Sequence, residues 1–215
     1  MAISRSRIHS TILSCCFLCA SLACTILMIC SCIPPTNKDP PAIANIYALR
    51  ISYPNADVRV GPFALCINTT ETLSCGKFSE ADPIHLAALH PDIVDGIRTA
   101  HSLQRNVFHI GGLAFAVFFL FLALEAQLLY MLTCRSPTAR IIAFGVMGCA
   151  ILGSTVQGVV MLFVFAALKI ASSPAVQYVP GRYWIVLQWL SVGFAVSAVG
   201  ADSIFGPLAS ILDEI

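Results

Sequence analysis

The sequence predicts a membrane protein whose fold is an all-α bundle of four transmembrane helices with a small extracellular antiparallel β-sheet. Apolar residues make up 58% of the 215-residue chain and charged residues only 11%, whereas a soluble domain usually carries about 25% charged residues. Four windows are apolar over the roughly 20 residues that a bilayer-spanning helix needs. The long segment between the first two windows carries strand and turn signals instead.

The polar composition limits the partners that the chain can have. Its net charge is +1, which provides no basic surface for nucleic acid. No nucleophile lies beside a plausible base, and no zinc-protease, P-loop or dinucleotide motif occurs. The expected partners are therefore the lipid bilayer and either another membrane protein or a second copy of the chain, and no enzyme activity or cofactor is expected.

The predicted spans divide the chain into alternating membrane and aqueous segments. The transmembrane helices are expected at residues 12–33, 107–132, 141–168 and 183–208. The segments outside the membrane are the N-terminus 1–11, the long loop 34–106, the short loops 133–140 and 169–182, and the C-terminus 209–215.

The first window has a second interpretation, as a cleaved signal peptide. Arg5 and Arg7 precede it, and Ser21-Leu22-Ala23 resembles a signal-peptidase site. The apolar run continues about ten residues beyond Ala23, whereas the apolar core of a signal peptide usually spans 7–15 residues. The length of the run therefore favours a transmembrane helix that is retained.

Basic residues set the predicted orientation. Four spans place both termini on one side of the membrane. That side then holds Arg5, Arg7, Arg135 and Arg140. The short loop on the other side carries only Lys169 and Arg182. Positive residues concentrate on the cytoplasmic side, so both termini are expected in the cytoplasm and the long loop outside the cell.

The long loop carries the strand signals. Ile46–Tyr53 reads IYALRISY and ends at Pro54-Asn55, which is typical of a strand followed by a turn. Val58–Asn68 predicts a second strand, in which Gly61-Pro62 marks a bulge or an edge. Thr72–Phe78 predicts a third. These strands are expected to form a small antiparallel sheet.

Cys66 and Cys75 are the cysteines of this folded part of the loop. Eight residues lie between them, enough for a hairpin to bring the two together. Outside the cell they are expected to form a disulfide, which would contribute roughly 2–3 kcal/mol. A metal site with His85 or His90 is the weaker alternative, because zinc-binding cysteine pairs usually lie two to four residues apart. No metal site is therefore predicted.

Two further motifs agree with an extracellular loop that ends in a helix. Asn68-Thr69-Thr70 is a sequon for N-glycosylation. Asp82-Pro83 fits a helix N-cap followed by proline at the first helical position. Ile93, Ile97 and Leu103 then recur at helical spacing and lead into the second span.

Polar residues inside the predicted spans form a candidate intramembrane site. Glu125 and Asp202 lie at similar depth in two helices of the same direction. Gln127 is close to Glu125 in sequence, and Gln157 lies in the middle of the third span. These residues are either a cation or proton site or a structural network in which Arg135 or Arg140 pairs with Glu125. The structural interpretation is favoured, because both acids lie within reach of an interface.

Small residues recur at four-residue spacing in the third and fourth spans. The rows are Gly145, Cys149 and Gly153; Ala150, Ser154 and Gly158; and Gly193, Ser197 and Ala201. Such rows let transmembrane helices approach closely. Packing inside the bundle is expected, with self-association as the alternative.

Three stretches of the outer loop carry a resemblance to a known group. They are IYALRISY, VRVGPFALC with Cys75 following, and DPIHL. With four spans and a large first outer loop, the chain resembles the claudin superfamily and, within it, the fungal calcium regulator and membrane fusion family. The motif residues that carry the resemblance are Gly61, Phe63, Cys66, Cys75, Asp82 and Pro83.

The resemblance implies both a fold and a function. The implied fold is a left-handed four-helix bundle with an extracellular sheet. The implied function is regulation of calcium influx at the plasma membrane, together with cell–cell membrane fusion during mating or polarised growth, so the calcium ion is an expected partner. The alternative is a claudin-like structural or adhesion organiser of membrane microdomains that conducts no ions.

Overall fold

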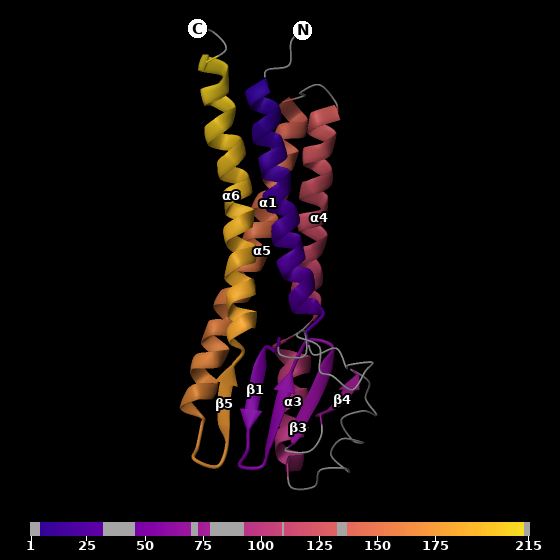
Figure 1. Cartoon of the computed structure of the whole chain (residues 1–215), viewed down its shortest axis with the longest axis vertical. Helices are drawn as coiled ribbons and strands as arrows, with labels where there is room; N and C mark the ends of the chain where they lie inside the picture. The colour runs from indigo at the N-terminus through magenta and orange to yellow at the C-terminus, as the bar shows by residue number, and fades with distance from the viewer. Residues whose placement is uncertain are drawn as a thin grey trace. The chain divides into compact units, whose positions relative to one another are not determined.

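The computed structural model describes residues 5–31, 46–69, 73–77, 93–108, 110–132 and 137–212. Figure 1 shows their arrangement. The elements, in chain order, are α1 (Arg5–Ile29), β1 (Leu49–Ser52), β2 (Ala56–Val60), β3 (Ala64–Thr69), β4 (Leu73–Lys77), α3 (Val94–Asn106), α4 (Ile110–Leu132), α5 (Pro137–Ile170), β5 (Gln177–Pro180) and α6 (Arg182–Leu212).

The predicted fold class is confirmed. Within the described residues four helices, α1, α4, α5 and α6, are long and apolar enough to cross a membrane. Four strands of a small antiparallel sheet, which carry a disulfide, lie in the chain between α1 and α4. The chain is therefore a multi-pass membrane protein with four spans.

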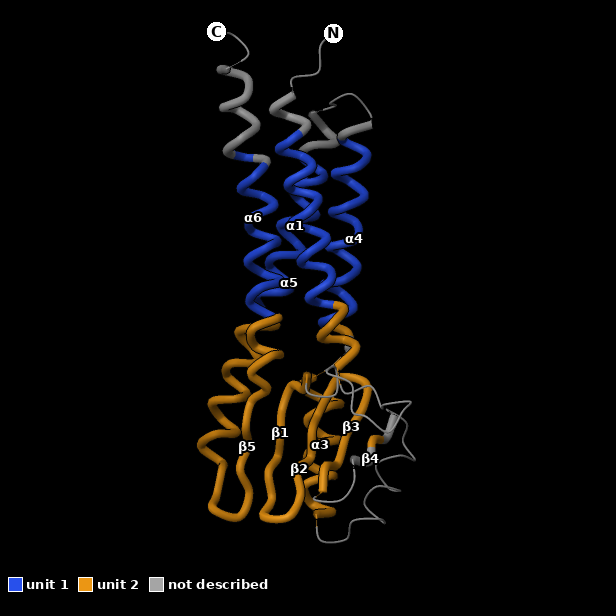
Figure 2. The backbone as a smooth tube through the Cα atoms, viewed as in Figure 1, with its two compact units in different colours: residues 1–25, 112–156, 188–215 blue, residues 26–111, 157–187 orange. Residues whose placement is uncertain are grey.

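The structure divides into two compact units (Figure 2). The helical unit consists of Met1–Thr25, Gly112–Val156 and Gln188–Ile215. The sheet unit consists of Ile26–Gly111 and Gln157–Leu187, and it contains the five described strands and α3. Each unit is described by itself below.

The core of the helical unit draws on all four of its helices. One cluster of buried residues contains Leu18 from α1, Leu120 and Ala123 from α4, Met147 and Ala150 from α5, and Ala195 and Ala198 from α6. Alanines supply more than half of the cluster. Small side chains let helix backbones approach closely, which is how helices associate where lipid removes the hydrophobic driving force.

Helix α1 is polar on its inner face and apolar on its outer face. Its buried residues within the helical unit include five with hydroxyl side chains: Ser10, Thr11, Ser14, Ser21 and Thr25. Ile12 and Leu13 are exposed instead. This distribution suits a bilayer, where lipid accepts the apolar side chains and polar groups must find partners inside the protein.

The strand order of the sheet is β4-β3-β2-β1-β5, and every neighbouring pair is antiparallel. Alternate residues of β1, β2 and β3 are buried on one face: Leu49, Ile51, Val58, Val60, Leu65 and Ile67. Helix α3 packs against β2 and buries Ile97 and Ala100. The apolar face of the sheet therefore lies under α3, and the opposite face carries the polar residues of the strands.

The predicted second strand, Val58–Asn68, is in fact two strands. Gly61, Pro62 and Phe63 form a tight turn between β2 and β3, in which the Gly61 N–H donates to the Ala64 carbonyl at 3.0 Å. Pro62 has no N–H to offer a ladder, and this explains why the chain reverses there rather than forming a bulge.

One strand of the sheet was not predicted from the sequence. Strand β5 comes from the short loop 169–182 and pairs with β1, with Tyr178 opposite Ile51. It has four residues, and its only described neighbour in the sheet is more than a hundred residues earlier in the chain. The first predicted strand is found in shorter form as β1, and the third is found as β4.

Candidate functional site

The polar face of the sheet carries a row of residues that lie directly opposite one another. Arg50 of β1 is opposite Arg59 of β2, Arg59 is opposite Cys66 of β3, and Cys66 is opposite Cys75 of β4. Directly opposite residues point to the same face of a sheet. Two guanidinium groups and a pair of cysteines are therefore arranged side by side across four strands.

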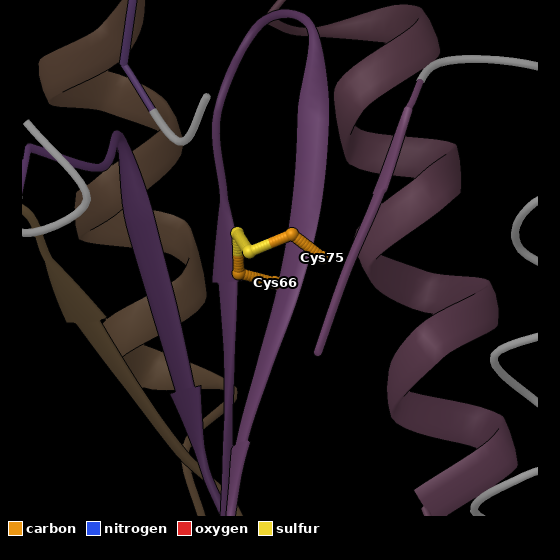
Figure 3. The surroundings of a disulfide bond; sticks show 2 residues. All are labelled: Cys66 and Cys75. Atoms are coloured by element: carbon orange, nitrogen blue, oxygen red, sulfur yellow. A yellow bond between two sulfur atoms is a disulfide. The ribbon is translucent and has the colours of Figure 1, made fainter. Parts of the chain in front are cut away.

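Cys66 and Cys75 are joined by a disulfide that ties β3 to β4 (Figure 3). Cys66 is only 1% exposed and packs with Ala64, Tyr47 and Cys75 in a small cluster of its own. Because the bond closes a short loop, it lowers the conformational entropy of the unfolded chain. This stabilises this edge of the sheet by about 2–3 kcal/mol.

The arginines next to the disulfide are held by an aromatic ring and an acid. The guanidinium carbon of Arg59 lies 5.6 Å from the centroid of the Tyr47 ring. Arg50 is 3.9 Å from a carboxylate oxygen of Asp57, and both side chains are partly exposed. Such a pair contributes only about 0–1 kcal/mol, whereas like charges directly opposite each other destabilise a sheet. The face is therefore better suited to recognition of an acidic group than to stability.

Asn68 of the sequon lies on this same polar face. It is opposite Asp57 of β2 and Leu73 of β4, and its side chain is half-buried. Asn68 and Thr69 of the sequon thus belong to strand β3, next to the row that contains the disulfide.

Gly61 and Phe63 of the family motif lie in the β2–β3 turn. The Gly61 carbonyl accepts a buried hydrogen bond of 2.6 Å from the side-chain amide of Gln104 in α3. This bond fixes the turn to the helix, whereas the side chain of Phe63 is 39% exposed. Asp82 and Pro83 of the motif lie outside the described residues, as do His85 and His90.

Two tyrosines and an acid meet where α3 contacts the sheet. A Cβ atom at Gly96 of α3 would collide with the Tyr53 phenol, so glycine lets the helix approach. Burial raises the pKa of the Tyr53 phenol, and the neighbouring Tyr178 and Asp95 raise it further. Burial disfavours the charged phenolate.

The polar residues of the spans do not form one cluster in the helical unit. Glu125 of α4 is exposed, whereas Gln127 is 1% exposed and its amide lies 3.7 Å from the sulfur of Met147. Two residues along a helix correspond to a rotation of about 200°, so these side chains point to opposite sides of α4. Gln157 belongs to the sheet unit, and the side chain of Asp202 lies outside those described.

Glu125 was predicted to pair with Arg135 or Arg140. Among the described side chains no salt bridge includes Glu125. The side chains of Arg135 and Arg140 lie outside the described part of the chain.

A buried network of hydroxyl groups between α1 and α6 was not predicted from the sequence. The Ser191 hydroxyl lies 2.9 Å from that of Ser21 and 2.9 Å from that of Thr25. The Ser21 hydroxyl also donates to the Ser191 carbonyl at 2.8 Å. One signal was available, because Ser14, Ser21 and Thr25 recur at helical spacing along one face of α1.

A second contact of this kind joins α6 to α5. The side-chain amide of Gln188 donates to the Ser154 carbonyl at 2.8 Å, and both residues are buried. Polar groups inside the helical unit therefore bind other parts of the bundle. This is typical of packing between transmembrane helices.

The small-residue rows are divided between the inside and the outside of the bundle. Ala150 and Ser154 are buried, as expected. Gly145, Cys149, Gly193 and Ser197 are exposed. A Cβ atom at Gly145 or Gly193 would meet nothing within 4 Å. The expectation of internal packing was therefore wrong for these four residues.

Comparison with known proteins corrects the family assignment. The sequence model of the SUR7/PalI family matches residues 10–200, which include most of α1, all of the sheet and the span of α6. No curated protein matches the chain. The resemblance to the fungal calcium regulator and membrane fusion family was wrong, and with it the expectation of calcium influx, fusion and a role in mating. The chain belongs to the SUR7/PalI family.

Proposed function

We propose that this protein is a structural organiser of plasma-membrane domains that conducts no ions. The observation that carries the proposal is the match to the SUR7/PalI family over residues 10–200. That family is associated with the organisation of membrane domains such as the eisosome, or with pH signalling. The termini lie in the cytoplasm and the sheet outside the cell, in agreement with the distribution of basic residues and the position of the disulfide.

The packing of the helical unit supports a structural role. Its core is a cluster rich in alanine, and hydroxyl and amide groups from α1 and α6 bind other groups of the same bundle. Interior polar groups that bind one another stabilise one arrangement of the helices. This is what a scaffold needs to present fixed surfaces.

The polar face of the sheet is the surface proposed to contact a partner outside the membrane. Arg50 and Arg59 lie next to each other on it, beside a disulfide that holds the strands in place. Guanidinium groups bind carboxylates and phosphates with two parallel hydrogen bonds. The partner of this face is therefore expected to present acidic groups.

The distribution of the full chain in fungal cells tests this function. A fluorescent fusion is expected in stable patches of the plasma membrane, with slow recovery after photobleaching. Replacing both arginines, Arg50→Gln with Arg59→Gln, should disperse the patches. Arg182→Gln, at the start of α6, serves as the matched control and should leave them intact.

An even distribution of the wild-type fusion, with rapid recovery, would contradict the proposal. In that case, a growth defect that appears only in alkaline medium when the protein is removed from the cells would favour the pH-signalling role of the family instead. Calcium entry is expected to be the same with and without the protein.

A further inference from the structure

Helix α4 presents an ionisable side chain to the outside of the bundle. Phe118 and Phe121 are 57% and 49% exposed, and Glu125 follows them on the same stripe at helical spacing. We call these three residues the α4 ridge. A carboxyl group that faces lipid is costly, and ionisable groups in spans usually face protein or water. No described side chain forms a salt bridge with Glu125, so a protein neighbour at the ridge would give the carboxyl group a partner.

Helix α6 presents a row of small residues to the outside of the bundle. Gly193 and Ser197 are exposed, Gly200 follows on the same stripe, and a Cβ atom at either glycine would meet nothing within 4 Å. We call these three residues the α6 notch. The Ser197 hydroxyl donates to the Gly193 carbonyl of its own helix at 2.8 Å, and it can rotate to bind an incoming carboxyl group.

The ridge and the notch lie at the same level of the bundle. Leu120 and Ala123, within the ridge segment, share one core cluster with Ala195 and Ala198, within the notch segment. The first and last residues of each surface are seven positions apart, which is about 10 Å along the helix. Helices α4 and α6 run in the same direction and lie on opposite sides of the helical unit (Figures 1 and 2).

We infer that the α4 ridge of one copy packs into the α6 notch of a second copy of this chain. The phenylalanines fill the space left by the missing glycine side chains, and the Glu125 carboxyl group reaches the Ser197 hydroxyl. Rows of small residues occur in many packed helices. What points to a protein neighbour here is the carboxyl group in the middle of an apolar outward stripe, with a notch of equal length at equal depth on the same molecule.

The contact is head-to-tail rather than symmetric. Each copy offers its ridge on one side and its notch on the other, so each addition leaves both surfaces available. Such contacts produce rings or open arrays. The inference deepens the proposed function and depends on it, because a growing array of one chain is a way to build a membrane domain.

Energy transfer between labelled copies of the full chain in phosphatidylcholine vesicles tests the inference. The notch-filled variant combines Gly193→Leu with Gly200→Leu, and the ridge-truncated variant combines Phe118→Ala, Phe121→Ala and Glu125→Ala. Each variant alone is expected to lose self-association by about tenfold or more. Gly145→Leu is the matched control, because that glycine is exposed and a Cβ atom there also meets nothing within 4 Å.

Mixing the two variants distinguishes a head-to-tail contact from every symmetric one. The notch-filled copy keeps its ridge and the ridge-truncated copy keeps its notch, so the mixture should recover energy transfer and stop at dimers. Glu125→Gln alone, which keeps the shape of the ridge, should weaken association less than truncation does. Thermal unfolding in detergent should show that each variant folds.

Several results would overturn the inference. They are a wild-type chain that stays monomeric, a ridge-truncated variant that still self-associates, a mixture that does not recover, and a Gly145→Leu control that loses as much association as the notch-filled variant. Patches in cells that persist despite such a result would leave the proposed function standing. If the mixture recovers energy transfer but the protein is evenly distributed in cells, the inference stands and the proposed function fails.

Discussion

At the scale of single residues, Gly181 determines how the edge strand β5 is attached. Its N–H donates to the Ala48 carbonyl at 2.9 Å, and a Cβ atom there would collide with the Tyr47 carbonyl. Any side chain at this position therefore pushes β5 away from β1. Glycine is needed at position 181 because the backbone there comes very close to the backbone of Tyr47, and not because the chain turns.

We expect Gly181→Ala to destabilise the sheet unit by about 1–3 kcal/mol, the usual cost of overpacking. Denaturant unfolding of the purified protein in detergent measures the change. Gly145→Ala is the control, since a Cβ atom at that exposed glycine meets nothing within 4 Å. Equal stability of the two variants would show that β5 moves aside at no cost.

Replacement of Cys66 with serine should cost about 2–3 kcal/mol, because the unfolded chain is no longer closed into a loop. The same loss is expected from Cys75→Ser, and the double variant should cost no more than either single one. Unfolding with and without a reductant measures the effect. Cys149→Ser, at an exposed position of α5, should change neither curve.

Tyr53 makes the sheet unit sensitive to alkali. Its pKa is raised in the folded state by burial first and then by Tyr178 and Asp95. The folded state therefore holds the proton more tightly, and stability falls as the pH rises above the unfolded tyrosine pKa of about 10. Thermal melting between neutral pH and alkaline pH should show this loss, and Tyr53→Phe should reduce it. An unchanged slope in the variant would assign the loss to other groups.

At the scale of elements, the hydroxyl network is one of the contacts that hold α1 to α6, beside the hydrogen bond from Ser10 to the Ala201 carbonyl and the stacking of Phe17 on Phe194. Ser191→Ala removes the partner of both Ser21 and Thr25, and we expect a loss of about 0.6–1.7 kcal/mol, the range measured for such bonds between membrane helices. Ser203→Ala on the same helix is the control, because that side chain is exposed. Unfolding in mixed detergent compares the two variants.

The elements themselves were largely predictable, but their partners were not. Length and hydropathy predicted four spans, and β-branched runs predicted strands in the long loop. Strand β5 has four residues and pairs with a strand far back in the chain, so no local signal marked it. Pro62 was interpreted as a bulge because the apolar pattern continues on both sides of it, and only the pairing of β2 with β3 reveals the turn.

The direction in which polar span residues point was also beyond the sequence. Helices α4 and α6 are apolar all round, so hydrophobic periodicity does not indicate which face is inside. Glu125 was predicted to lie inside its span at a depth similar to that of Asp202, and its outward direction came only from the structure. In α1 the periodicity of serine and threonine did carry this information, because those residues seek partners inside the bundle.

At the scale of the whole molecule, the proposed orientation makes a prediction about glycosylation. If the sheet lies outside the cell, Asn68 is available to the glycosylation machinery, since its side chain is half-buried rather than enclosed. The full chain from fungal cells should lose mass on treatment with an endoglycosidase. Thr70→Ala destroys the sequon and should remove this shift, whereas Thr69→Ala keeps it and should not. If the wild-type chain carries no glycan, the orientation is tested instead by labelling the N-terminal segment that contains Arg5 and Arg7 from each side of the membrane.

The contact between α1 and α6 also constrains how the protein is made. Ser21 and Ser191 are 170 residues apart, so the first helix enters the membrane long before its partner has been synthesised. During that interval the Thr25 hydroxyl can bind the Ser21 carbonyl of its own helix, at 3.0 Å in the finished fold. Assembly then waits for the last helix. A ribosome that stalls before α6 leaves a row of hydroxyl groups facing lipid, a defect that membrane quality control can recognise and remove.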